Sequence, residues 1–165
     1  MKKLHILLLC LLIAVPFGQA ISIDDLYRSF SKEKGVQSFH LNKFLTGMLK
    51  LDPEFRELNL KELKMLDLEK CKPEMQEQFT QKVNLFLNEA SGKYQTDINA
   101  TESDVSVYIL THRQEETILE FIVLTTGKEC GLIAMKGNFK PEVLEKWLDD
   151  SDVDIPDSTP LSSQP

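Results

Sequence analysis

The stretch VSVYILTHRQEETILEFIV, residues 105–123, decides the fold of this chain. Apolar side chains recur at alternate positions on both sides of the polar link HRQEE, a pattern typical of two antiparallel strands joined by a hairpin. Segments 94–100 and 131–136 have the same strand character, and the polar links NATESD and TTGKEC connect them to this pair. The sequence therefore predicts a four-stranded antiparallel meander, because short polar links suit hairpins.

Helical spacing accounts for most of the remaining sequence. Ser22 and Asp25 form a capping-box pattern before a predicted helix over residues 23–30. Further helices are predicted over 41–49 and 73–90, and a closing helix from Pro141, whose apolar stripe is Val143, Leu144, Trp147 and Leu148. Two short strands are predicted over 36–40 and 63–69, with an irregular charged segment over 54–62.

These periods together predict the fold class. An antiparallel meander sheet with helices packed on it is an α+β arrangement, and a chain of this length forms one hydrophobic core. We expect a single α+β domain over residues 21–148, with a sheet of about four to six strands and helices packed on one face.

The two ends of the chain differ from this domain in composition. Residues 1–20 combine Lys2 and Lys3 with an unbroken apolar run and end in GQA, so they are predicted to be a signal peptide that is cleaved before Ile21. Residues 149–165 are rich in Asp, Pro and Ser and are predicted to be a disordered acidic tail. The sequence thus predicts export to the periplasm or the medium. Cys10 follows Leu9, where a lipoprotein needs a small residue, so no lipid anchor is expected.

The charge balance limits the classes of partner. Residues 1–20 hold two of the 19 basic residues and none of the 26 acidic ones, which leaves 17 against 26, a net charge of −9 after cleavage. Such a surface is repelled by nucleic acid and by anionic lipid. We expect no nucleic-acid partner and no stable membrane insertion once the signal peptide is removed.

Two cysteines remain after cleavage, Cys71 and Cys130. In an oxidising compartment they can form a disulfide, which would stabilise the fold by on the order of 4 kcal/mol. The alternative is a pair of buried thiols that behave as small apolar side chains.

Reactive side chains show no spacing typical of a known site. Zinc sites bring ligands in close pairs, whereas His40, Cys71, His112 and Cys130 are scattered singly. No nucleophile elbow, phosphate loop or metalloprotease motif is present. Glu120 is the one acid inside an apolar strand, and we expect it to face solvent. The sequence predicts no catalytic residue, no cofactor and no metal.

Four segments resemble a known family: FSKEKGV at 30–36, GMLKL at 47–51, LKMLDLE at 63–69 and GLIAMKGNFKPEVLEKW at 131–147. Together they are similar to domain-of-unknown-function family 4252, small exported proteins found mainly in Bacteroidetes. The resemblance covers about residues 23–148. It implies an exported bacterial α+β domain and carries no catalytic residues.

The leading hypothesis is a non-enzymatic envelope module that binds a protein or a small ligand. The contact surface would be an apolar face or an open edge of the meander, where unpaired backbone groups accept an extra strand. The candidate binding face is Ile118, Ile122 and Leu124, unless helices cover both faces of their strand. The alternative hypothesis is a small hydrolase or a thiol enzyme that uses Cys71 or an acid not evident from spacing.

Overall fold

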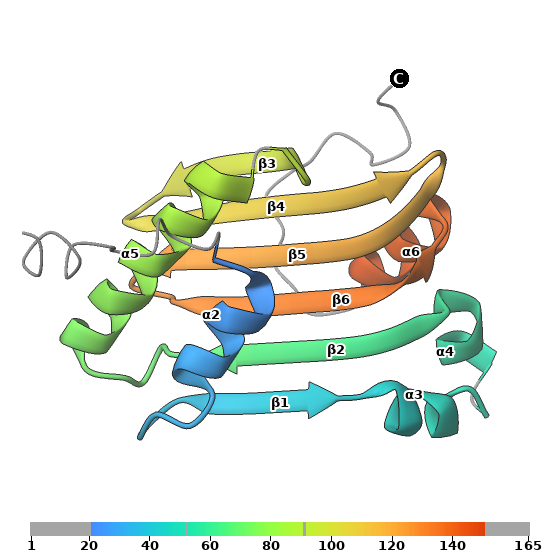
Figure 1. Ribbon diagram of the computed structural model, residues 1–165, viewed down its shortest axis with the longest axis horizontal. Helices are drawn as coiled ribbons and strands as arrows, with labels where there is room; N and C mark the ends of the chain where they lie inside the picture. The colour runs from blue at the N-terminus through green and yellow to red at the C-terminus, as the bar shows by residue number, and fades with distance from the viewer. Residues whose placement is uncertain (1–20, 52, 91, 151–165) are drawn as a thin grey trace, which may run out of the picture.

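The computed structural model describes residues 21–51, 53–90 and 92–150. The predicted signal peptide and the predicted tail beyond residue 150 lie outside the described residues. Within them, the chain forms one sheet with helices against it, as Figure 1 shows.

The sheet has six strands, all of them antiparallel, in the order β1-β2-β6-β5-β4-β3. They are β1 (Gln37–Leu41), β2 (Leu60–Asp67), β3 (Gln95–Glu102), β4 (Val105–Gln114), β5 (Thr117–Gly127) and β6 (Gly131–Phe139). The last four form the predicted meander in chain order. The predicted strands at 36–40 and 63–69 correspond to β1 and β2, which extend the sheet beyond β6 and leave β1 and β3 at its edges.

Five helices complete the described part of the chain: α2 (Ile23–Phe30), α3 (Lys43–Leu49), α4 (Pro53–Leu58), α5 (Pro73–Ala90) and α6 (Pro141–Asp150). Ser22 caps α2 through the predicted capping box, in which its side chain accepts from Asp25 N–H and the Asp25 side chain accepts from Ser22 N–H. The prediction of an irregular segment over 54–62 was wrong. Pro53 starts α4, because proline is tolerated in the first turn of a helix.

Helices α2 and α5 lie side by side across one face of the sheet (Figure 1). Phe30 of α2 packs edge to face on Phe79 of α5, with ring centroids 5.2 Å apart. Beneath them lie buried side chains from four strands, Leu66, Leu110, Ile122, Leu124, Leu132 and Ala134. This layer is the larger core.

Helices α4 and α6 contribute to a second core on the opposite face. Leu58 and Leu144 join Phe121, Met135 and Phe139 there, all nearly inaccessible to solvent. The helices therefore lie on both faces, not on one as expected. The reason is β5, whose apolar side chains alternate between the two faces and need cover on each.

The candidate binding face at Ile118, Ile122 and Leu124 is not a surface, because all three side chains are buried. Ile122 and Leu124 belong to the core under α2 and α5, whereas Ile118 belongs to the core with α6. A register irregularity between Ile118 and Glu120 moves Ile118 to the other face. Their burial excludes Ile118, Ile122 and Leu124 from contact with a partner.

Candidate functional site

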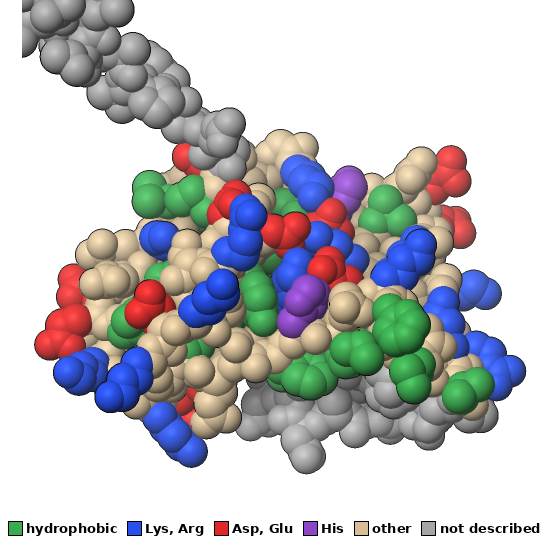
Figure 2. Space-filling view, turned by 60° about the horizontal axis from the view of Figure 1, so that its bottom comes forward, with side chains coloured by type: hydrophobic (Ala, Val, Ile, Leu, Met, Phe, Trp, Pro, Cys, Tyr) green, Lys and Arg blue, Asp and Glu red, His purple; other side chains and the backbone are tan. Residues whose placement is uncertain are grey.

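All but one of the exposed large apolar side chains in the described chain gather along β1, β2 and α3. We name this set the α3–β1 surface and define it as Phe39, Phe44, Leu45, Met48, Leu51 and Met65. Leu51 is 85% exposed, Phe44 76% and Met48 60%. Figure 2 shows hydrophobic side chains along this side of the molecule. A cluster of large apolar side chains in solvent marks a contact surface more often than a single one does.

Helix α3 directs its apolar stripe away from the domain. Asn42 caps the helix by accepting hydrogen bonds from the N–H groups of Phe44 and Leu45, each at 3.1 Å. The polar Thr46 is 2% exposed, and its hydroxyl donates to the carbonyl of Lys61 at the start of β2 at 3.0 Å. Because Thr46 occupies the inner side of the helix, the stripe of Phe44 and Met48 faces solvent.

Strand β1 forms one open edge of the sheet. Among the strands of the described residues its one neighbour is β2, and four of its five residues are exposed. Phe39 pairs with Met65 of β2. Both side chains lie on the face of the sheet opposite α2 and α5, called the outer face below, beside the exposed stripe of α3. Edge strands of soluble proteins usually carry charged side chains or bulges that block further pairing. β1 contains no Lys, Arg, Asp or Glu.

The opposite edge, β3, has the protection that β1 lacks. Its register with β4 is interrupted between Thr96 and Ile98. The side chain of Asp97 in this interruption points inward, is 4% exposed and lies 3.7 Å from Nη2 of Arg113. A bulge and an inward-pointing charge both discourage pairing with another strand. The two edges therefore differ in their capacity to accept a new strand.

Exposed cations outnumber exposed acids around the α3–β1 surface, where Glu57 of α4 is the acid beside Arg56. Residues 36–51 contain no Asp or Glu, although the whole chain carries a net charge of −7. Lys43, Lys50, Arg56 and Lys61 are all exposed. Lys50 Nζ lies 3.5 Å from Oδ1 of Asn59, and Lys61 Nζ lies 2.9 Å from Oδ1 of Asn138, so these two lysines have neutral partners. Figure 2 shows blue side chains beside the hydrophobic ones here.

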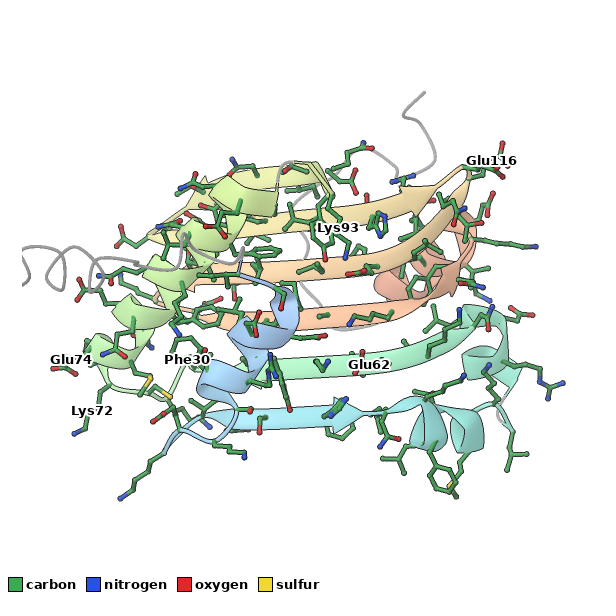
Figure 3. All side chains as sticks on the ribbon, viewed as in Figure 1. Phe30, Glu62, Lys72, Glu74, Lys93 and Glu116 are labelled. Atoms are coloured by element: carbon green, nitrogen blue, oxygen red, sulfur yellow. The ribbon has the colours of Figure 1, made fainter. Side chains whose placement is uncertain are left out.

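A second feature crosses the sheet on the face of α2. We name it the cross-sheet ionic row. It contains His40 of β1, Glu62 and Lys64 of β2, Lys136 of β6, Glu120 of β5 and His112 of β4, joined by Asp24, Lys93 and Tyr94. Consecutive members are cross-strand partners: His40 with Lys64, Lys136 with Glu62 and with Glu120, and Glu120 with His112. Figure 3 labels Glu62 and Lys93 toward its two ends.

The half of the row near β1 is built around two acids and two lysines. Lys64 Nζ lies 2.7 Å from Oδ1 of Asp24 and 2.8 Å from Oε1 of Glu62, and Lys136 Nζ lies 3.2 Å and 3.3 Å from the same two carboxyl groups. His40 Nε2 lies 3.0 Å from Oε1 of Glu62. Burial alone would raise the pKa values of Asp24 and Glu62, but hydrogen bonds and the positive charges of the lysines lower both.

The other half of the row is built around Glu120. Its side chain is 16% exposed and accepts hydrogen bonds from Lys93 Nζ and the Tyr94 hydroxyl, each at 2.6 Å. Burial opposes its negative charge, yet these hydrogen bonds and the charges of Lys93 and Lys136 lower its pKa. Burial and the neighbouring carboxylate raise the pKa of Tyr94. The expectation that Glu120 faces solvent was wrong, because residues after α5 cover it.

Comparison with known families gives a match over most of the chain. The family described as Domain of unknown function (DUF4252) matches residues 27–147. The chain belongs to the DUF4252 family. The match includes the α3–β1 surface and most of the cross-sheet ionic row, and it confirms the resemblance seen in the sequence. No curated protein and no solved structure matches the chain.

Each carboxylate in the ionic row of this DUF4252 protein has protein partners. Its carboxylates bind lysines, a histidine or a tyrosine, and a general acid would instead need a carboxyl whose pKa is raised. Among the described residues, no three His, Cys, Asp or Glu side chains converge as a metal site would require. The row is therefore best understood as a structural element that joins α2 and the α5–β3 link to the sheet.

The two cysteines in the described part of this DUF4252 chain are free thiols, Cys71 half-buried and Cys130 buried. Burial raises the pKa of both, and the charge of Asp67 adds to the effect at Cys71. A catalytic thiol needs a lowered pKa. The geometry at Cys71 thus gives no support to the thiol-enzyme alternative.

A shallow hollow of about 270 Å³ lies on the outer face of the sheet. Met65, Val107, Val123 and Ile133 line it, so it is mainly apolar. Met65 belongs both to this hollow and to the α3–β1 surface, which makes the two features continuous. None of the helices in the described part of the chain has the length and apolar character that crossing a membrane requires.

Proposed function

We propose that this DUF4252 protein is an exported, non-catalytic binding module that holds another envelope protein through the α3–β1 surface. The observation that carries the proposal is the outward apolar stripe of Phe44, Met48 and Leu51. Leu85 of α5 is also exposed, at 51%, but it is a single residue on a polar helix face. Phe44, by contrast, belongs to the group of exposed apolar side chains that forms the α3–β1 surface.

The energetic argument concerns what a partner would gain by covering these residues. Full burial of one Phe, Leu or Met side chain contributes roughly 1.5–3 kcal/mol. Part of this is lost to the cost of association, so three or four such side chains suit a reversible contact of moderate affinity. Phe44 and Met48 remain mostly exposed in the folded protein, since Thr46 takes the inner position on α3.

Site-specific photocrosslinking tests this proposal. A photoreactive amino acid is placed at position 44 or, as the matched control, at position 85, and cells of the source organism are irradiated. We expect a discrete adduct with another protein at position 44 and none at position 85. Equal adducts at both positions, or none at either, would contradict the proposal.

Export is tested separately. The N-terminal basic and apolar pattern supports cleavage before Ile21. Protein sequencing of the purified material should give a first residue of Ile21, with the protein in the periplasmic or extracellular fraction. A cytoplasmic protein that begins at Met1 would contradict export and leave the surface proposal to its own test.

A further inference from the structure

Resting on the proposed function, we infer that the partner presents an extended acidic segment, which pairs with β1 as a seventh strand and places its apolar side chains against Phe39 and α3. The first support is the difference between the two edges of the sheet. β3 has a bulge and the inward-pointing Asp97, whereas β1 has neither a bulge in its pairing with β2 nor a Lys, Arg, Asp or Glu. The backbone of β1 is therefore open to an added strand.

The second support is the placement of side chains around that edge. A strand beside β1 directs alternate side chains to the two faces of the sheet. On the outer face they would meet Phe39, whose partner on β2 is Met65, next to the exposed stripe of α3. On the other face they would meet Ser38 and the half-exposed His40. The fitting segment thus alternates apolar and small polar residues.

The third support is charge. The strand and helix at 36–51 lack acids, and Lys43, Lys50, Arg56 and Lys61 lie exposed around them. Acidic residues that flank the apolar part of the segment would meet these cations. Complementary charges of this kind raise the association rate and fix the register of a bound strand.

The net charge of the whole chain argues against two other occupants. A second copy of this chain also carries a net charge of −7, and an antiparallel β1–β1 pair would bring Lys32 and Lys34 of one copy toward Lys43 of the other. An anionic membrane is repelled by the overall negative charge. Both occupants are nevertheless outcomes that the experiment detects.

The test uses the purified protein and a fluorescent peptide of alternating Val and Thr with two Asp at each end. Two control peptides accompany it: one with Lys in place of Asp, and one with every Val and Thr amide N-methylated, which removes the backbone donors on both edges of the peptide strand. Fluorescence anisotropy should show binding of the Asp peptide and at least ~10-fold weaker binding of both controls.

The K43E/K50E variant should prefer the Lys peptide. The matched variant K72E/K128E, which has the same change in charge at the other end of the sheet, should keep the original preference.

Several results would overturn the inference. Equal affinity for the Asp and Lys peptides would rule out recognition of an acidic segment. Equal affinity for the Asp peptide and its N-methylated form would rule out strand pairing with β1. A dimer in sedimentation that F44S/M48S abolishes identifies a second copy as the occupant. Binding to phosphatidylglycerol vesicles that F44S/M48S abolishes identifies a membrane. If no peptide binds while crosslinking at position 44 still gives a protein adduct, the inference fails and the proposed function stands.

Discussion

The hydroxyl of Tyr94 donates a 2.6 Å hydrogen bond to Oε2 of Glu120, which ties the segment after α5 to the middle of β5. Lys93 binds the other carboxylate oxygen, also at 2.6 Å. Both residues lie between α5 and β3. The chain crosses the sheet through α5, from β2 to the far edge strand β3, and Glu120 fixes the end of this crossing.

Replacement of Glu120 by Gln should destabilise the fold. The amide keeps the shape of the side chain but loses the charge that faces Lys93 and Tyr94, so we expect the free energy of unfolding to fall by about 1–3 kcal/mol. Urea denaturation of E120Q measures this. E116Q is the matched control, because Glu116 is exposed in the β4–β5 turn, and its change should stay within about 0.5 kcal/mol. Equal effects of the two changes would show that Glu120 contributes nothing specific.

The ionic row also predicts how stability depends on pH. Asp24, Glu62 and Glu120 have folded pKa values below their ordinary ones. Their contribution is therefore fully present above the unfolded pKa values, at about 4, and is lost as pH falls through the folded values. Lys136 has a raised pKa, so its contribution is present below about pH 10 and is lost only at higher pH.

Urea midpoints between pH 7 and pH 2 test this dependence. Wild-type stability should change little down to about pH 5 and decline below about pH 4. The D24N/E62Q/E120Q variant should be less stable at neutral pH and show a shallower decline in acid. If the stability of this variant falls with pH as steeply as that of the wild type, the loss of stability in acid comes from other carboxyl groups.

Gly127 should tolerate no side chain. Its φ of +101° lies in the left-handed region, and an added Cβ would overlap the carbonyl oxygen of Asp104. G127A should therefore lose more than about 1 kcal/mol of stability. G47A is the control, since a Cβ at Gly47 in α3 meets nothing within 4 Å and alanine favours a helix. A melting temperature of G127A at or above that of the wild type would contradict this account of the turn.

The cysteines should differ in reactivity. Cys71 is half-buried and Cys130 is 2% exposed. In the native protein a thiol reagent should modify Cys71 first, and C71S should abolish this early reaction. After denaturation without reductant, the protein without residues 1–20 should show two reactive thiols. A count of zero would indicate a disulfide between Cys71 and Cys130 in the exported protein.

Most elements of the fold could be predicted from sequence because their signals are local. The capping box of Ser22 and the two prolines that start α5 and α6 act within one turn of a helix. The alternation in β4 and β5 depends only on neighbouring residues. The pattern around Pro53 did not predict α4, because a proline that ends one helix can also begin the next.

The candidate site was harder to predict, for a different physical reason. Periodicity shows that 41–49 is amphipathic but not which side faces the domain. In α3 the inner position is held by Thr46, whose hydroxyl bonds to Lys61 far along the chain. The environment of Glu120 likewise depends on Lys93 and Tyr94, which only the crossing of α5 brings near. Such contacts require the strand order, which the sequence pattern did not contain.

The most direct test of the central claim is the affinity of the crosslinked partner for three forms of the protein: wild type, F44S/M48S and L85S. All three should fold with similar stability, because the altered side chains are exposed. The account predicts that F44S/M48S binds at least ~10-fold more weakly, a loss of about 1.4 kcal/mol, while L85S binds as the wild type does. Equal dissociation constants for wild type and F44S/M48S would contradict a binding role for the α3–β1 surface.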